Sequence, residues 1–479
     1  MNIGAKFLAL VFVLVSPSAW GDVLLRWTSA DLLPAKELGL NALVLPWSDT
    51  VWTQVRAAQK KGYRVYLEVP LRQAPAAAKG ASGLEGIILT ARQSETAELN
   101  RSLPKLRSAH PNIKFVVLSP VGKRPQLRGS LVIKRGSVLE VSSPTAQPWI
   151  DTNLALVKVE QRSHQGQVPL YSFSWKQSSE SGAPALTAAD YSLAVAEAGA
   201  FHADLILNID KHLLSGLSAH DPAALTSWNE VRSHAEFYTH TAAPEADAAA
   251  NVAVVVDDLD PTDENMNLLA RHNLPFKVLS PLDLKSGSFE GFDVVVVFAK
   301  SDTEGSRRIA DLATRGKTVV LVEAHGSYPW HSSEAVRVNE HTVSYAVGQG
   351  KVLELSEPVT DPETFAQDIR RLLGNGNMLM SLWNGLTTIA VPYRQHDGAM
   401  EAIEFVNYAV EQPLRVQVQV KGSFASIRYE TPERGCCESL ATKRHDGFTE
   451  FVIPELRIAG RVYLDSKQAI DSRARGTNP

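Results

Sequence analysis

Three carboxylates stand at or near the ends of apolar, strand-like runs. Glu68 lies late in "YRVYLEVP", Asp210 ends "ADLILNID", and Asp151 closes "SSPTAQPWID", a stretch with two prolines and a tryptophan. Paired carboxylates suit general acid and base catalysis. Glu68, Asp151 and Asp210 are therefore the candidate catalytic residues.

Aromatic side chains accompany these carboxylates. The candidate substrate-binding residues are Trp27, Trp149, Tyr171 and Trp175. An aromatic ring offers a large apolar face, which suits stacking against a sugar ring. Trp149 is equally suited to plugging an apolar core.

An ordinary structural role competes with each catalytic assignment. Glu68 is suited to pairing with Arg26 inside a barrel, and Asp210 to pairing with Lys211 or capping a turn. Asp151 is suited to capping the helix that follows it, because aspartate is a favoured N-cap residue. These roles compete with the hypothesis that all three carboxylates face one cleft.

The residues that position these side chains form a repeated pattern. Apolar runs, most of them followed by a helical pattern, occur at 23–27, 41–46, 63–70, 84–90, 113–120, 137–143, 168–175 and 203–210. Eight such units predict a (β/α)8 TIM barrel over residues 22–241. The carboxylates would then lie at the C-terminal mouth of the barrel, where barrel enzymes carry out their chemistry.

The pattern changes twice after the barrel. Residues 242–250 read as a small-residue linker, and strands alternate with helices again over 251–383, which predicts a flavodoxin-like α/β domain. Short strands with a period of two over 384–465 predict a small β-sandwich. The polar tail 466–479 is predicted to be disordered.

The N-terminus has the features of a signal peptide. Lys6 precedes a short apolar run, and small residues at Ala19 and Gly21 fit cleavage before Asp22. Residues 1–21 therefore predict export, to the periplasm or out of the cell; an N-terminal membrane anchor is the alternative. No later run approaches the roughly 18 apolar residues of a membrane span, so none is expected in the mature chain.

Composition argues against several kinds of partner. A net charge of −4 gives no reason to expect nucleic acid. The only cysteines, Cys436 and Cys437, are adjacent, which excludes a disulfide framework and a cysteine-rich zinc site. His325 and His331 share a loop without a clear third ligand, so we expect no metal and no cofactor.

The order of barrel, flavodoxin-like domain and β-sandwich resembles the retaining β-galactosidases of glycoside hydrolase family 42. The closing segment "AIEFVNYA…LRVQVQVKG…FVIPELRIAGRVYLD" is similar to the final sandwich of such hydrolases. The resemblance implies a carbohydrate ligand. It also implies a glutamine amidotransferase-like middle domain that serves in homo-oligomerisation. Glutaminase activity itself is excluded, because residues 251–383 contain no cysteine nucleophile.

The chain departs from that family at its catalytic motifs. The family has an acid in an Asn-Glu pair ending strand four and a glutamate nucleophile ending strand seven. Here Thr90, Ala91 and Arg92 follow the fourth run, and Trp175 and Lys176 follow the seventh. The sequence thus predicts an exported glycoside-hydrolase-like protein that acts on or binds a carbohydrate at the C-terminal face of the barrel. The alternative is a non-catalytic glycan-binding or assembly scaffold with a degenerate barrel, and the sequence leaves open whether the protein is an enzyme.

Overall fold

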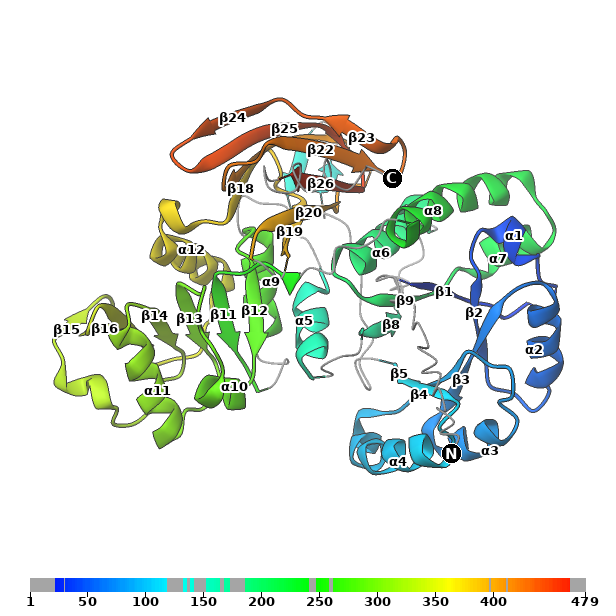
Figure 1. Cartoon of the computed structure of the whole chain (residues 1–479), viewed down its shortest axis with the longest axis horizontal. Coiled ribbons are helices and arrows are strands. Elements are labelled where there is room, and N and C mark those ends of the chain that lie inside the picture. Colours follow the sequence, from blue (N-terminus) through cyan, green and yellow to red (C-terminus); the bar gives the residue numbers. More distant parts are fainter. Residues whose placement is uncertain are drawn as a thin grey trace, which may run out of the picture.

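The computed structural model places a barrel at one side, an α/β domain at the other, and two β-sheets above them (Figure 1). It describes residues 22–29, 31–118, 132–135, 138–141, 152–163, 168–172, 186–240, 247–257, 262–395, 398–410 and 412–465. Within these ranges no helix is both long enough and apolar enough to cross a bilayer.

The N-terminal sheet is a nearly closed parallel barrel of seven strands. In spatial order these are β5 (Lys114–Val117), β4 (Gly86–Thr90), β3 (Arg64–Pro70), β2 (Ala42–Pro46), β1 (Val23–Arg26), β9 (Asp204–Leu207) and β8 (Leu170–Ser172). One parallel bridge, Leu118 to Leu170, connects the two ends of this sheet. The barrel expected from the sequence is therefore present, and the described residues contribute seven strands to it.

The prediction of a barrel strand at 137–143 is wrong. Strand β7 (Val138–Val141) pairs antiparallel with β6 (Val132–Arg135), and these two strands form a sheet of their own. Only two residues, Gly and Ser, separate the two runs in the sequence, and such a spacing is a hairpin signal. The two strands pair as this spacing indicates. The stretch "SSPTAQPWID", which contains Asp151, therefore follows a hairpin strand and not a barrel strand.

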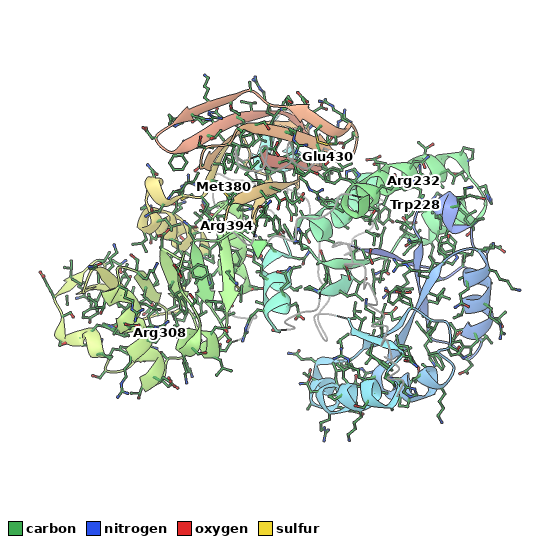
Figure 2. All side chains as sticks on the ribbon, in the orientation of Figure 1. Trp228, Arg232, Arg308, Met380, Arg394 and Glu430 are labelled. Carbon is green, nitrogen blue, oxygen red and sulfur yellow. A yellow bond between two sulfur atoms is a disulfide. The ribbon has the colours of Figure 1, made fainter. Side chains whose placement is uncertain are left out.

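Helices cover the outer face of the barrel sheet. They are α1 (Ala35–Leu38), α2 (Val51–Lys60), α3 (Ala74–Lys79), α4 (Thr96–Ala109), α6 (Ala188–Ala200), α7 (Lys211–Ser218) and α8 (Pro222–His240), with 3₁₀ turns η1 (Leu71–Gln73) and η2 (Gln93–Glu95). Trp228 on α8 is buried, and its indole N–H donates to the carbonyl of Leu38 at 2.8 Å (Figure 2). This bond fixes the last long barrel helix against the first, short one.

Helix α5 (Leu154–Ser163) leaves the barrel and packs on the middle domain. Its neighbours there are α9 (Asp263–Arg271) and β12 (Phe276–Leu279). The side-chain carbonyl of Asn267 on α9 accepts a hydrogen bond from the backbone N–H of Ala155 at 3.2 Å. A helix N-terminus has free N–H groups, and here the neighbouring domain satisfies one of them.

The middle domain is built on a seven-stranded sheet. Its order is β12, β11 (Val252–Val255), β13 (Val294–Val297), β14 (Thr318–Leu321), β17 (Gly350–Leu355), β16 (Thr342–Val347) and β15 (Ala335–Arg337). Its other helices are α10 (Pro281–Ser286), α11 (Thr303–Thr314) and α12 (Pro362–Leu373), with turns η3 (Pro329–Ser332) and η4 (Asn375–Asn377). The pairs from β12 to β17 are parallel, and the valine runs in β11 and β13 are fully buried, as expected for a sheet covered on both faces.

Two antiparallel sheets pack face to face at the C-terminal end. The first has the order β10 (Asp247–Ala248), β19 (Thr388–Arg394), β20 (Met400–Asn407), β26 (Ala459–Asp465), β22 (Ser426–Thr431) and β23 (Gly435–Ser439). The second has the order β18 (Met380–Trp383), β21 (Leu414–Lys421), β25 (Phe448–Leu456) and β24 (Thr442–His445). Met380 (Figure 2) belongs to the apolar core between them. Strand β10 falls within the predicted linker, so this segment is part of a sheet.

The three parts share one continuous apolar core. It runs from the barrel strands through α5 and α9 to the buried side of β19 and β20. The hydroxyl of Tyr393 on β19 donates to the carbonyl of Ala200 at 2.7 Å, and its ring stacks on His202 with 4.0 Å between the centroids. Large shared apolar interfaces hold domains in one arrangement, so we expect this chain to behave as one rigid unit.

Candidate site at the barrel mouth

The side chains of the barrel strands divide into two sets. One set packs outward on the helices. The other forms a separate cluster of Leu24, Ala42, Val44, Tyr66, Ile88, Leu170 and Ile206. Because side chains alternate along a strand, this second cluster fills the barrel interior.

A polar layer caps this apolar interior at the C-terminal ends of the strands. Each member lies two positions after an interior residue and so faces the same way. The members are Arg26 on β1, Glu68 on β3, Ser172 on β8, and Asn208 immediately after β9. Four different strands thus bring hydrogen-bonding groups to one mouth.

Glu68 is bound by Arg26 through both carboxylate oxygens. The Arg26 Nε donates to Oε2 at 2.8 Å and Nη2 donates to Oε1 at 2.6 Å. The third guanidinium nitrogen donates to the side-chain carbonyl of Asn208, whose amide donates to Ser172 Oγ at 2.6 Å. A planar guanidinium holds a carboxylate in a fixed orientation, so the layer is rigid and polar.

The pair at the mouth remains partly accessible. The side chain of Arg26 is 21% exposed and that of Glu68 is 16% exposed. Pairing with Arg26 was the structural alternative for Glu68, and the structure shows this pairing. It does not exclude contact with a ligand, because the same carboxylate lies on the interior face at the barrel mouth.

Asp210 acts as the N-cap of helix α7. Its Oδ1 accepts from the backbone N–H of Leu213 at 2.8 Å, and its Oδ2 accepts from the hydroxyl of Tyr191 at 2.8 Å. Both oxygens are therefore engaged in holding α7 against α6. The capping alternative describes this residue in the structure.

Replacing Asp210 separates the capping role from a catalytic one. Asp210→Ala is expected to destabilise the protein by about 1–2 kcal/mol, because one cap and one buried hydroxyl partner are lost. Asp210→Asn keeps an oxygen for capping and is expected to unfold close to the wild-type temperature. Thermal unfolding of both variants checks this, and an equal loss in both would contradict the capping role.

Tyr171 and Trp27 lie on the outward face of their strands. Tyr171 is 0% exposed and Trp27 is 2% exposed, and both belong to the core shared with the helices. Leu170 and Leu24 face the barrel interior. Tyr171 follows Leu170 by one position and Trp27 follows Leu24 by three, so both rings point to the opposite, outward side. Their rings pack in the core, so the structure offers neither ring a free face for a sugar.

Three predicted site residues lie outside the described residues: Asp151, Trp149 and Trp175. The structure therefore brings together Glu68 and its partners, and leaves Asp210 on its own helix. Sequence reasoning missed the functional placement of Ser172 and Asn208. Side chains two positions apart on a strand face the same way, so the interior residues Leu170 and Ile206 would have placed Ser172 and Asn208 at the barrel mouth.

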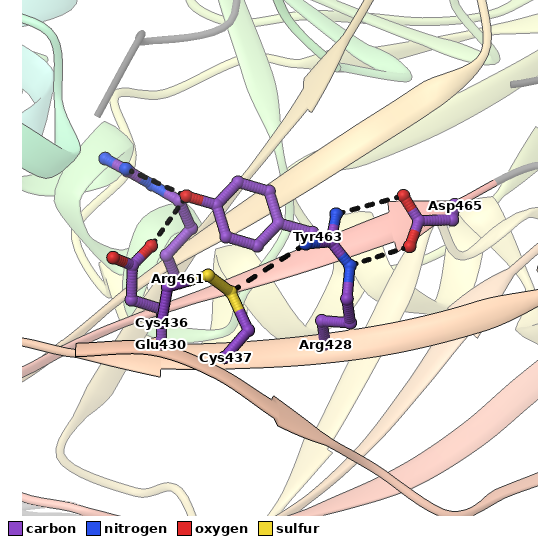
Figure 3. Close-up of a disulfide and its surroundings, with 7 residues drawn as sticks. All are labelled: Arg428, Glu430, Cys436, Cys437, Arg461, Tyr463 and Asp465. Atoms are coloured by element: carbon purple, nitrogen blue, oxygen red, sulfur yellow. Dashed lines mark hydrogen bonds and ion pairs between the residues drawn. A yellow bond between two sulfur atoms is a disulfide. The ribbon is translucent and has the colours of Figure 1, made fainter. Parts of the chain in front are cut away.

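A second polar group surrounds the disulfide between Cys436 and Cys437 on β23 (Figure 3). Both sulfurs lie within 4.8 Å of a Glu430 carboxylate oxygen, and Arg428 donates to the Cys437 sulfur at 3.8 Å. Among the described residues, this is the group whose atoms are close enough to hold a metal ion. Sulfurs joined in a disulfide are not thiolates, so the group as it stands offers a metal one carboxylate.

Comparison with known proteins gives a result at the level of the fold. No protein-family model matches the chain, and no curated protein matches its sequence. Solved structures do match. An α-L-fucosidase, isoenzyme 2 from Paenibacillus thiaminolyticus, aligns over 93% of this chain and 100% of its own with a TM-score of 0.59 and 10% identity. The chain therefore shares the fold of this α-L-fucosidase.

Two β-galactosidase structures also match, one of them from family 42. A GH42 β-galactosidase from G. stearothermophilus aligns over 94% of this chain and 98% of its own, with a TM-score of 0.55 and 8% identity. The β-galactosidase from Rahnella sp. R3 aligns over 92% and 99%, with a TM-score of 0.52 and 10% identity. The architectural resemblance to family 42 is thus confirmed for the glycoside-hydrolase fold.

Proposed function

We propose that this protein is exported and acts on a carbohydrate at the C-terminal mouth of its barrel. The polar layer of Arg26, Glu68, Ser172 and Asn208 carries the proposal, since it collects a carboxylate, a guanidinium, an amide and a hydroxyl over an apolar floor. Sugars present many hydroxyl groups, and sites for small ligands combine an apolar lining with a few convergent polar groups. The glycoside-hydrolase fold of the chain supports the same class of ligand.

Glu68 is the proposed carboxylate beside the reacting sugar. The sugar ring gains positive charge as a glycosidic bond breaks, and a carboxylate stabilises that charge. Arg26 fixes the orientation of Glu68, and Asn208 in turn fixes Arg26. A second carboxylate is needed as the acid, and the sequence proposes Asp151 for that part.

Hydrolysis assays on Glu68 variants test the proposal. Glu68→Gln keeps the size of the side chain and removes its charge, so we expect turnover of the best aryl glycoside or polysaccharide to fall about 100-fold. Turnover by Asp151→Ala is expected to fall by a similar factor. Glu98→Gln, at an exposed residue in the first turn of α4, is the control and is expected to keep wild-type turnover. Unchanged turnover in Glu68→Gln would remove Glu68 from the reaction.

A non-catalytic glycan-binding barrel is the second candidate. It is favoured by one observation, that both oxygens of Glu68 are bound by Arg26 and both oxygens of Asp210 hold α7. The same assays separate the two functions. Binding of a glycan without any turnover by the wild-type protein would establish the second candidate.

We also propose that the middle domain, whose parallel strand order is that of a flavodoxin-like sheet, supports association between copies of the chain. The sequence resemblance to family 42 supports this. Sedimentation of the purified protein measures the oligomeric state directly.

A further inference from the structure

The outward face of the four-stranded C-terminal sheet is open. On β21, Val416, Val418 and Val420 point into the sandwich core, so the residues between them point away from it. Figure 1 shows β24 and β25 at the outer edge of the molecule, away from both the barrel and the middle domain. We call the residues Trp383, Arg415, Gln417, Gln419, Lys443 and Glu450 the outer sheet face.

Strand register brings five of these side chains into two adjacent rows. Trp383 on β18 pairs directly with Gln417 on β21. Gln419 pairs with Glu450 on β25, which pairs with Lys443 on β24. Paired side chains in an antiparallel sheet lie about 5 Å apart, and strands repeat every ~4.8 Å, so the two rows make one continuous platform.

Trp383 is an exposed anchor on this platform. Its side chain is 44% exposed, whereas the tryptophans Trp27, Trp228 and Trp330 are almost completely buried. Tryptophan is enriched among the residues that carry most of the binding energy at interfaces, so the Trp383 ring is a candidate anchor for a ligand. Beside it, the Gln417 amide offers donors and an acceptor to a ligand hydroxyl, and Gln419, whose amide nitrogen lies 3.1 Å from His445 Nε2, keeps its carbonyl oxygen as an acceptor.

The charge of the outer sheet face differs from that of the whole chain. The chain has 48 basic and 52 acidic side chains. The face has two basic side chains, Arg415 and Lys443, and one acidic side chain, Glu450, which lies 3.5 Å from His445. Among the described residues, Arg415 and Lys443 make no ion pair within 4.0 Å, although Lys443 is the cross-strand partner of Glu450. The face therefore keeps an excess of positive charge, which suits an anionic ligand.

We propose that the outer sheet face binds an extended acidic polysaccharide whose charges are uronate carboxylates. Trp383 stacks on a sugar ring, the two glutamines bond to hydroxyls, and Arg415 and Lys443 bind carboxylates on either side. This inference rests on the proposed function only in taking a carbohydrate as the ligand. It assigns a second site, on a different domain from the barrel mouth.

Binding of polygalacturonate by the purified full chain, measured by affinity electrophoresis and calorimetry, tests this site. Trp383→Ala is expected to weaken binding at least 10-fold, and so is the double change Arg415→Gln with Lys443→Gln. The wild-type affinity is expected to fall as salt is raised, because the charge contribution is screened. Leu282→Ala, at an exposed leucine on α10, and Lys105→Gln, at an exposed lysine on α4, are controls expected to bind as wild type.

The outcomes separate this site from the barrel mouth. Glu68→Gln is expected to bind polygalacturonate as wild type does, whatever its turnover. The proposal is overturned if polygalacturonate does not bind, if Trp383→Ala binds unchanged, or if Glu68→Gln alone loses binding. If neutral dextran binds as tightly as polygalacturonate, the ligand need not be acidic and the proposal is wrong. If dextran sulfate binds more tightly, the site does not prefer uronate carboxylates and the proposal is also wrong. Unfolding temperatures of Trp383→Ala and the double variant within about 2 °C of wild type exclude misfolding as the cause.

Discussion

Glu404→Leu is expected to destabilise the protein by about 3–5 kcal/mol, although it replaces a polar side chain with an apolar one in a buried place. Glu404 and Arg461 form an ion pair in the six-stranded sheet, with side chains 1% and 2% exposed. Removing the carboxylate leaves the guanidinium buried without its counter-charge. An uncompensated buried charge is among the most costly changes known in a protein core.

The surroundings of Arg461 explain why it cannot move to water. Its guanidinium lies 4.9 Å from the centre of the Phe237 ring and 5.7 Å from that of Tyr238, both on barrel helix α8. It also donates to the hydroxyl of Tyr463 at 3.4 Å. The charge is thus enclosed between the barrel and the C-terminal sheet, and its loss should loosen that contact.

A double replacement provides the decisive comparison. Glu404→Leu with Arg461→Met removes both charges, so this variant is expected to be more stable than either single variant. Asp368→Leu, which breaks the exposed pair with Arg371, is the control and is expected to change stability little. Calorimetric unfolding measures the wild type, Glu404→Leu, Arg461→Met, the double variant and Asp368→Leu. A double variant less stable than both singles would show that the pair itself stabilises the junction.

The stability of the wild type relative to Glu197→Gln is expected to fall as the pH rises from about 4.5 to about 7. Burial raises the pKa of Glu197 from 4.5 to about 7, and the hydrogen bonds it accepts only partly offset this. It accepts from Tyr408 Oη at 2.5 Å and from the Asn153 amide at 2.7 Å. The carboxyl group therefore lies between barrel helix α6, the start of α5 and the C-terminal sheets.

The direction of this change follows from proton binding. Between pH 4.5 and 7 the folded state keeps the proton that the unfolded state has lost, so stability decreases as pH rises. The contribution is fully present below about 4.5 and is lost once the pH passes about 7, and it is on the order of 3 kcal/mol. Glutamine does not titrate, so Glu197→Gln lacks this slope.

Only the difference between the two proteins isolates Glu197. Burial lowers the pKa of His202 to about 3, which makes stability rise between about pH 3 and 6.5, in the opposite direction. Burial also raises the pKa of Asp204 to about 7, in the same direction as Glu197. Both groups are present in wild type and variant and cancel on subtraction. Urea unfolding at pH 4.5, 5.5, 6.5 and 7.5 gives the difference, and a constant value would contradict the prediction.

Much of the fold could be predicted because local pattern and tertiary structure agree. The period-two run at 448–456 became β25 with the same bounds, and the run at 459–465 became β26. Strand β25 buries Thr449, Phe451 and Ile453 in alternation, so its pattern has one interpretation. The prediction of a barrel strand at β7 failed because a short run of β-branched residues suits a hairpin and a barrel strand equally. The strand available for pairing, here β6, decides between them.

The candidate site was harder to predict than the fold, for a physical reason. The sequence places Glu68 late in a strand. Glu68 and Arg26 pair because both side chains point to the interior side of their strands. Asp210 also ends a strand, but the first free N–H groups of α7 lie within its reach, and a helix start competes strongly for a carboxylate. A position at a strand end therefore makes a residue a candidate for the site. Whether its side chain points to the barrel mouth depends on the element that follows.

Strand β10 has a consequence for how the chain is completed. It is made directly after the barrel, yet its partner β19 follows more than 130 positions later, after the whole middle domain. The hydroxyl that bonds to Glu197 is likewise 211 positions away, at Tyr408. When only the barrel has left the ribosome, the sides of its helices that later contact the C-terminal sheets, such as that of Phe237 and Tyr238 on α8, are still uncovered. Contacts of such long sequence separation form slowly, so assembly of this protein must wait for its final strands.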